Sequence, residues 1–127
     1  MPSNKTVRFG PIALTTTLTT NILNPGTTTG GVNMPATSTN LFFLLKHIRI
    51  VNKTTAAAAY TLYIGATGAN AAGTEFMGKA KSVAANSADE WFAGGNGMRL
   101  DVADFLVGGS DTATALTIQG EMEVGVV

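Results

Sequence analysis

Cysteine is absent from the 127-residue chain, and histidine occurs once, at His47. The first absence excludes disulfides, thiolate metal sites and a cysteine nucleophile. The second leaves His47 without another imidazole, which excludes a histidine-rich metal site. We therefore predict no metal and no cofactor.

Charge is scarce as well. Charged residues make up 13% of the chain, about half the usual share, and the formal net charge is zero. We expect no nucleic-acid partner, because phosphate binding requires a surface rich in Lys and Arg. A protein that is abundant as a free monomer usually keeps a net charge for solubility, so this composition suits a protein docked on a partner.

Long hydrophobic runs are also missing. The longest strongly apolar run, Leu41 to Leu45, is far shorter than the roughly 20 residues that span a bilayer as a helix. The N-terminal residues are polar and lead into no apolar segment, so we expect neither an export signal nor a membrane partner.

The clearest pattern that is present lies near the C-terminus. Alternate residues from 116 to 126 are apolar or glycine, and the residues between them are mostly polar. A period of two over this length predicts a strand with one buried and one exposed face. Gly120 falls on the buried face, where it leaves room for a large neighbouring side chain.

Shorter alternating segments lie upstream. Residues 41–52 predict a strand in which Leu44, Lys46, Ile48 and Ile50 share one face. Its first half is apolar on both faces, as in a strand covered on both sides, and its second half alternates with Ile48 and Ile50 inward. Residues 59–65 predict its hairpin partner.

The remaining segments complete an all-β fold. Residues 79–92 are expected to be extended with a short turn, and 98–102 to form a further strand. Residues 27–40 contain almost nothing to bury and predict a long loop. Short strands punctuated by Gly-rich turns predict one antiparallel β-sandwich domain over 1–127, with a jelly-roll-like arrangement.

The first nine residues are interpreted as an extended N-terminal arm. They are polar, and Lys5 and Arg8 are their only charges. A terminus of this kind becomes ordered only where a partner supplies contacts. We expect it to lie along a neighbouring subunit, with Lys5 and Arg8 meeting acidic groups and Val7 or Phe9 becoming buried there.

Few residues suggest chemistry. Glu121 and Glu123 share a strand face and could serve as the acid and base of a glycosidase. A solvated strand face explains them more simply, as it does His47 beside Arg49, so we predict that the protein is not an enzyme.

Trp91 belongs to the one aromatic pair, Trp91-Phe92. An exposed Trp91 would stack on a sugar or anchor a partner, whereas a buried one would fill an end of the sandwich core. It joins the arm residues as a candidate partner contact.

The order of these segments resembles a known class of proteins. Ile-Arg-Ile-Val-Asn (48–52), Tyr-Thr-Leu-Tyr-Ile-Gly (60–65), Met-Arg-Leu (98–100), Ala-Asp-Phe-Leu (103–106) and Leu-Thr-Ile-Gln-Gly-Glu (116–121) follow one another as in small β-sandwich virion proteins of tailed phages. These are capsid cement or decoration proteins and related neck or tail accessory proteins. The resemblance implies a jelly-roll-like sandwich that is usually oligomeric, often trimeric, and assembled on a host shell.

The leading expectation is therefore a capsid decoration or cement protein, located in the virion after assembly in the host cytoplasm. Its partners would be copies of itself, with a trimer as the expected form, and the major capsid protein or another virion protein. A neck or tail accessory protein and a carbohydrate-binding module are the alternatives, and a hydrolase is a third.

The alternation at the C-terminus generates a direct test. Ile118→Ala should lower the free energy of unfolding by about 2–5 kcal/mol, because it empties a buried position. Thr117→Ala, on the opposite face, should change it little. Equal losses at the two positions in a denaturant titration would show that the faces are assigned wrongly.

Overall fold

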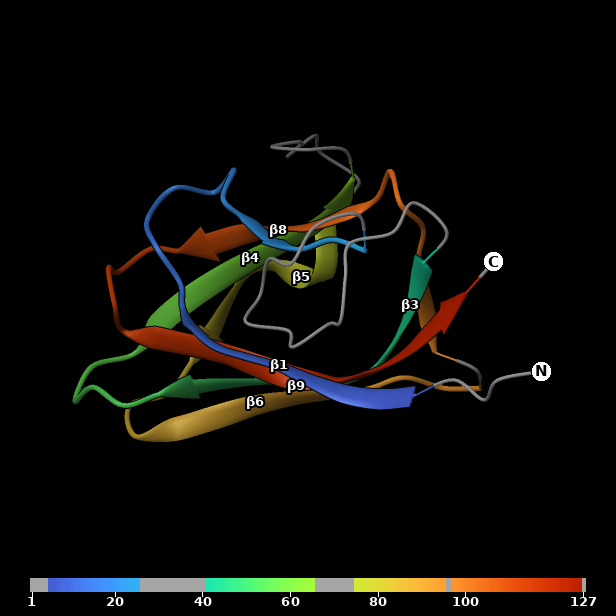
Figure 1. The fold of residues 1–127 in the computed structure, drawn as a ribbon. Helices are drawn as coiled ribbons and strands as arrows, with labels where there is room; N and C mark the ends of the chain where they lie inside the picture. Colours follow the sequence, from blue (N-terminus) through green and yellow to red (C-terminus); the bar gives the residue numbers. More distant parts are fainter. Residues whose placement is uncertain (1–4, 26–40, 66–74, 96, 127) are drawn as a thin grey trace.

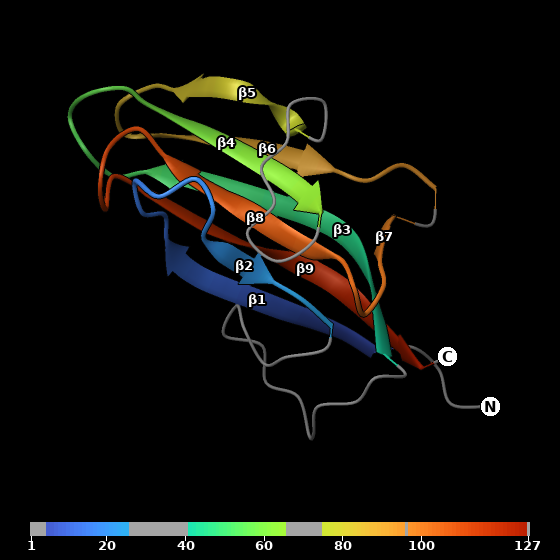
Figure 2. The same ribbon diagram turned by 90° about the horizontal axis from the view of Figure 1, so that it is seen from above.

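The computed structural model describes four stretches of the chain, residues 5–25, 41–65, 75–95 and 97–126. Nine strands account for most of these residues, and they form two antiparallel sheets that face each other (Figures 1 and 2). The described residues contain no helix capable of crossing a membrane. The loop predicted over 27–40 lies outside the described residues.

Each sheet draws its strands from both halves of the chain. The first sheet has the spatial order β1 (Lys5–Ala13), β9 (Leu116–Val126), β3 (Leu41–Asn52) and β6 (Ser87–Phe92), and the short β7 (Met98–Leu100) also pairs with β3. The second sheet has the order β2 (Asn21–Leu23), β8 (Phe105–Ser110), β4 (Ala58–Gly65) and β5 (Glu75–Val83). The predicted antiparallel β-sandwich is confirmed, as is the extended segment with a turn over 79–92.

One hydrophobic core fills the space between the sheets. Both inner faces contribute fully buried side chains, among them Phe9, Phe43, Leu45, Ile48, Ile50, Ile118 and Met122 from the first sheet and Ile22, Leu23, Tyr60, Leu62 and Leu106 from the second. Each large apolar side chain that is buried in this way stabilises the fold by about 1.5–3 kcal/mol.

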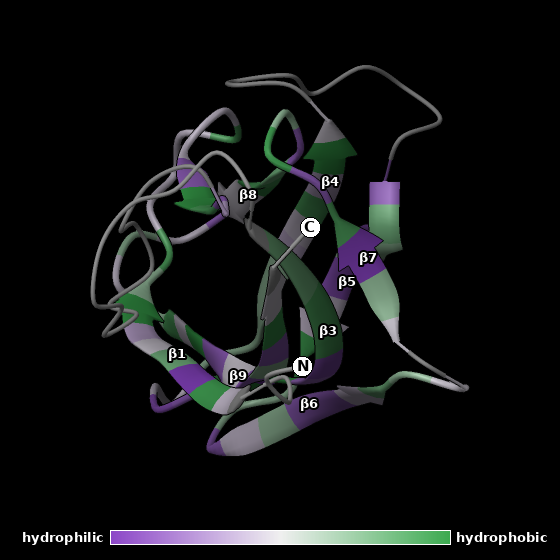
Figure 3. Ribbon diagram, turned by 45° about the vertical axis from the view of Figure 1, so that its right-hand side comes forward, coloured by the Kyte–Doolittle hydropathy of each residue, from purple (hydrophilic) through white to green (hydrophobic). Residues whose placement is uncertain are grey.

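Strand β9 has the predicted faces. Leu116, Ile118 and Met122 are completely buried, whereas Glu121 is exposed. Strand β1, which pairs with β9, also alternates, and its hydrophilic and hydrophobic bands are visible in Figure 3. Both strands therefore present one face to the core and the other to solvent.

Strand β3 departs from the predicted alternation because its pairing with β9 contains a β-bulge. Leu45 pairs with Met122 and His47 pairs with Glu121, so Lys46 is an extra residue. A bulge reverses the face on which the following residues lie. Leu45, rather than Leu44, is therefore the buried residue before the bulge, while Ile48 is buried after it, as predicted.

The hairpin predicted between 41–52 and 59–65 is wrong, because β3 and β4 lie in different sheets. The turn between them is held by the buried Asn52 side chain. Its Nδ2 donates hydrogen bonds to the carbonyl oxygens of Ala56 and Val83, and its Oδ1 accepts one from the Thr54 amide. This corner carries the chain from one sheet to the other, so that both apolar strands face a single core.

The N-terminal arm is also corrected. Residues 5–9 form the first half of β1 and pair with β9 of the same chain, from Lys5 opposite Val124 to Phe9 opposite Gly120. Phe9 is completely buried and belongs to the core. Phe9 in the core, Val7 packed against it and the main-chain pairing with β9 hold this otherwise polar segment in the sheet.

The room that was predicted above Gly120 is filled by Phe9. A Cβ atom at position 120 would lie 2.8 Å from Cε1 of Phe9 and would overlap the carbonyl oxygen of His47. The missing side chain thus lets β1, β9 and β3 pack around one aromatic ring.

This close packing predicts that Gly120→Ala is destabilising. We expect a loss of about 1–3 kcal/mol in the free energy of unfolding, since the backbone of β3 must move to admit the methyl group. Gly94→Ala is the matched control, because no atom lies within 4 Å of a Cβ built there. Urea titrations that give the same midpoint for both variants would contradict the packing described.

Candidate functional site

The side chains that point outward from the first sheet form two neighbouring rows. In one row, Arg8 of β1, Glu121 of β9, His47 of β3 and Phe92 of β6 lie opposite one another across the strands. In the next row, Gln119 of β9 and Glu90 of β6 flank Arg49 of β3. We call these seven residues the outer-face patch.

An exposed aromatic ring is the most unusual part of this patch. Phe92 is 68% exposed, more than any other large hydrophobic residue in the described part of the chain. Its ring stacks on the imidazole of His47, with a centroid separation of 4.4 Å and an interplanar angle of 12°. The histidine therefore backs the phenylalanine and fixes its orientation.

Charged groups in the patch are only partly paired. Nε of Arg49 lies 3.2 Å from Oε1 of Glu90. Nε2 of His47 is buried, lies 3.9 Å from the same Glu90 oxygen, and has no hydrogen-bond partner within the described residues. The imidazole is thus held by stacking on Phe92 and not by a hydrogen bond to Nε2.

A hollow of about 170 Å³ opens beside the histidine. It is lined by Arg8, His47, Arg49, Gln119, Gly120 and Glu121. Within the described residues, no hydrogen bond or ion pair engages the side chains of Arg8, Gln119 and Glu121.

A second hollow, of about 250 Å³, lies on the other sheet. Its lining consists mainly of small residues: Thr16, Leu18, Ala59, Thr61, Ala80, Ser110 and Asp111. It has no charged group besides Asp111, whose Oδ1 accepts a hydrogen bond from the Ala59 amide. It offers fewer specific contacts than the outer-face patch.

The structure separates the five residues predicted to contact a partner. Arg8 is exposed and lines the outer-face hollow, while Val7 packs against the core and Phe9 lies inside it. Lys5 begins β1, opposite Val124. Among those whose side chains the structure describes, only Arg8 lines the candidate site.

Trp91, the fifth predicted residue, is half-buried and packs against the core, edge-on to Phe76 with ring centroids 4.9 Å apart. The neighbouring Phe92 is the exposed aromatic residue instead. The sequence shows both rings in a strand but does not show which faces inward, because that depends on the partner strand β3.

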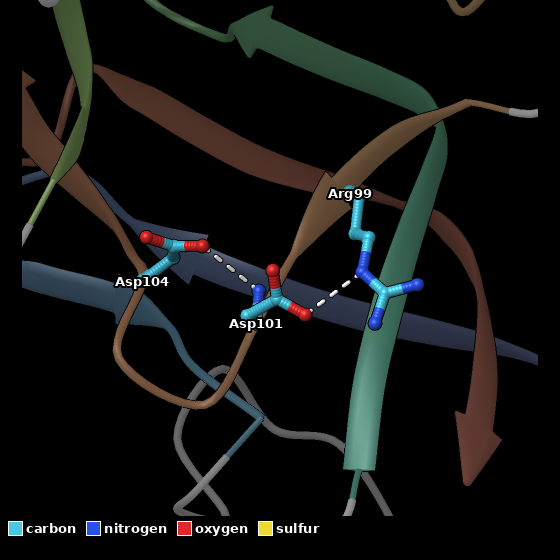
Figure 4. A network of polar contacts seen from close by, with 3 residues as sticks. All are labelled: Arg99, Asp101 and Asp104. Atoms are coloured by element: carbon cyan, nitrogen blue, oxygen red, sulfur yellow. Dashed lines mark hydrogen bonds and ion pairs between the residues drawn. The ribbon is translucent and has the colours of Figure 1, made fainter. Parts of the chain in front are cut away.

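Of the two carboxylates considered as a glycosidase pair, Glu123 has a side-chain partner, whereas Glu121 has none among the described residues. Two further carboxylates, Asp101 and Asp104, have structural contacts. Glu123 forms an ion pair of 2.9 Å with Lys46, and Asp101 accepts a hydrogen bond of 2.8 Å from Nε of Arg99. Figure 4 shows the turn after β7, in which the carboxylate of Asp104 accepts a hydrogen bond from the Asp101 amide. The bond is 2.9 Å long and closes the turn. Within the described ranges, no cluster of three or more His, Cys, Asp or Glu residues is placed to hold a metal.

A second polar cluster bridges the two sheets. The hydroxyl of Tyr60 on β4 donates a short hydrogen bond to Oδ2 of Asp89 on β6, and Nζ of Lys81 on β5 lies 3.1 Å from the same oxygen. Burial raises the pKa of Asp89, but the contacts with Tyr60 and Lys81 outweigh it, so this pKa lies below its ordinary value of 3.8. Burial and the nearby carboxylate raise the pKa of Tyr60 above its ordinary value of 10.0.

These directions predict a pH dependence of stability. The lowered pKa of Asp89 contributes stability above pH 3.8 that is lost as the pH falls through the folded-state value. At neutral pH, Tyr60→Phe should cost about 1–3 kcal/mol, and the difference from the wild type should narrow well below pH 3.8. The raised pKa of Tyr60 predicts a further loss of stability above pH 10.

Urea titrations at neutral and acidic pH measure this difference. Asp101→Asn is the control. Asp101 and its partner Arg99 are both half-exposed, and such ion pairs contribute little to the free energy of unfolding, so this variant should behave like the wild type. A Tyr60→Phe penalty that is the same at both pH values would show that the ionised Asp89 does not contribute through this bond.

No family model matches the chain, and neither a curated protein nor a solved structure matches it.

Proposed function

We propose that the protein is a non-enzymatic structural protein of a phage virion, a capsid decoration or cement protein that stabilises the shell by bridging capsid subunits. The alternative within this proposal is an accessory protein of the virion's neck or tail. Association with further copies, with a trimer as the expected form, belongs to the proposal.

The order of the strands is the observation that supports it. Along the chain the strands alternate between the two sheets, except where β5 follows β4 and β7 follows β6. The orders β1-β9-β3-β6 and β2-β8-β4-β5 are those expected when two Greek keys interlock, and we infer a jelly roll. This architecture is frequent in viral capsid domains and also in lectins, so the assignment to a virion is an analogy of fold.

The outer edge of β1 offers a mechanism for docking. Among the described strands, β1 pairs only with β9, which leaves its other edge open to a strand from a neighbouring subunit. The regular part of β1 runs from Lys5 to Phe9, before the register shift at Gly10 and Pro11. Strand β5, at an edge of the second sheet, is interrupted at Met77 and Ala80, whose φ angles are 71° and 49°. The proposed docking contact is therefore main-chain pairing along the edge of β1, and not the extended N-terminal arm that the sequence predicts.

Proline substitutions in β1 test this mechanism. Consecutive residues of a strand direct their N–H groups to opposite edges, so one of Thr6→Pro and Val7→Pro alters the free edge and the other breaks a bond to β9. The variant that keeps the wild-type thermal midpoint should bind weakly to virions stripped of the protein. The other should lose about 1 kcal/mol or more of stability.

Sedimentation of each variant with the stripped virions measures the binding, and thermal unfolding identifies which edge was altered. Saturable binding of the wild type is required. The edge mechanism is wrong if the variant with wild-type stability binds as well as the wild type, and the virion assignment is wrong if the wild type does not bind.

A further inference from the structure

We propose that the outer-face patch is a binding site for a neutral saccharide, with Phe92 as the stacking surface and Arg8, Gln119 and Glu121 as hydrogen-bonding groups. This site uses side chains on the face of the first sheet. The proposed shell contact uses main-chain groups at the edge of β1, so the two proposals stand or fall separately.

The aromatic ring has the properties of a stacking surface. His47 covers one side of Phe92 and holds it in place, yet 68% of the residue remains exposed. A pyranose ring has an apolar face of C–H groups, and packing this face on Phe92 removes apolar surface of both from water. Because the ring is already fixed by the stack, little side-chain entropy is lost on binding.

The groups around the hollow, at the other end of the patch from Phe92, match hydroxyl chemistry. The guanidinium of Arg8 only donates hydrogen bonds, the carboxylate of Glu121 only accepts them, and the amide of Gln119 does both. Sugar hydroxyls can donate and accept, and all three side chains line the hollow with no hydrogen-bond partner among the described residues. A polar ligand can thus satisfy them without breaking a bond to any of the described residues.

The dimensions of the patch suit a short oligosaccharide. Phe92 and Arg8 lie at opposite ends of a row that crosses four strands. Neighbouring strands are about 4.8 Å apart, so this row is roughly 14 Å long. A chain of sugar rings can lie along it, with one ring on Phe92 and the next over the hollow.

The balance of charge selects a neutral ligand. Arg8 and Arg49 contribute two positive charges, and Glu90 and Glu121 contribute two negative charges. Arg49 is already paired with Glu90 at 3.2 Å. A phosphate or polyuronate would meet as much repulsion as attraction here. A second protein copy is less suitable, because protein interfaces need an apolar centre, and Phe92 is the only large apolar side chain of the patch.

Affinity electrophoresis of the full chain tests the site. Native gels that contain soluble starch, laminarin or galactomannan provide neutral saccharides, and a gel with polygalacturonate provides an anionic one. We expect at least one neutral polysaccharide to retard the wild type and polygalacturonate to have no effect. Phe92→Ala should weaken the retardation about tenfold or more, whereas Phe92→Tyr should retain it.

Matched controls distinguish binding from misfolding. Val102→Ala truncates another exposed apolar side chain, outside the patch, and should leave the retardation unchanged. Arg8→Ala and Gln119→Ala should weaken it while the thermal midpoint is kept. Absence of retardation in all three neutral gels, or equal retardation of Phe92→Ala and the wild type, would overturn the proposal. The proposal would also be overturned if Phe92→Ala altered only the oligomeric mass of the protein and not its retardation. That result would assign the patch to a contact between copies of the chain.

Discussion

The bulge at Lys46 determines which side chains of β3 face the core and which face solvent. Strand β3 lies between β9 and β6, near the centre of its sheet, so its faces fix those of both neighbours. One extra residue allows Phe43 and Leu45 to point inward before the bulge and Ile48 and Ile50 to point inward after it. It also places Lys46 and His47 next to each other on the outer side, and the outer-face patch depends on this arrangement.

The amino-acid sequence predicts the parts of the fold that depend on local alternation. Strand β9 and the inward direction of Ile48 follow from a period of two, and the need for space at Gly120 follows from a glycine on a buried face. The pairing of strands could not be predicted, because the Asn52 corner that sends the chain to the other sheet is stabilised by Val83, which is distant in sequence. The burial of Phe9 likewise depends on a contact with Gly120 at the other end of the chain.

The candidate site was only partly predictable for the same reason. The charge of Arg8 marks it as a candidate contact, but the sequence alone predicts it on an arm, whereas the structure has it on the outer face of a sheet. Trp91 is a candidate partner contact from the sequence, which leaves open whether its ring is exposed or fills an end of the core. The register of β6 against β3 then places Phe92 opposite His47, and Trp91 opposite the buried Ile48. The residues of β6 alone do not show which of its two aromatic rings faces outward, because that depends on the register with β3.

The bulge is tested most directly by cross-linking, because the chain has no cysteine of its own. Leu44 pairs with Glu123 before the bulge, and Arg49 pairs with Gln119 after it. Both pairs can form only if β3 contains one more residue than β9 between them. We predict that L44C/E123C and R49C/Q119C each form a disulfide on mild oxidation, and that R49C/I118C, the pair expected without a bulge, does not. Efficient cross-linking of R49C/I118C, with none for R49C/Q119C, would contradict the account.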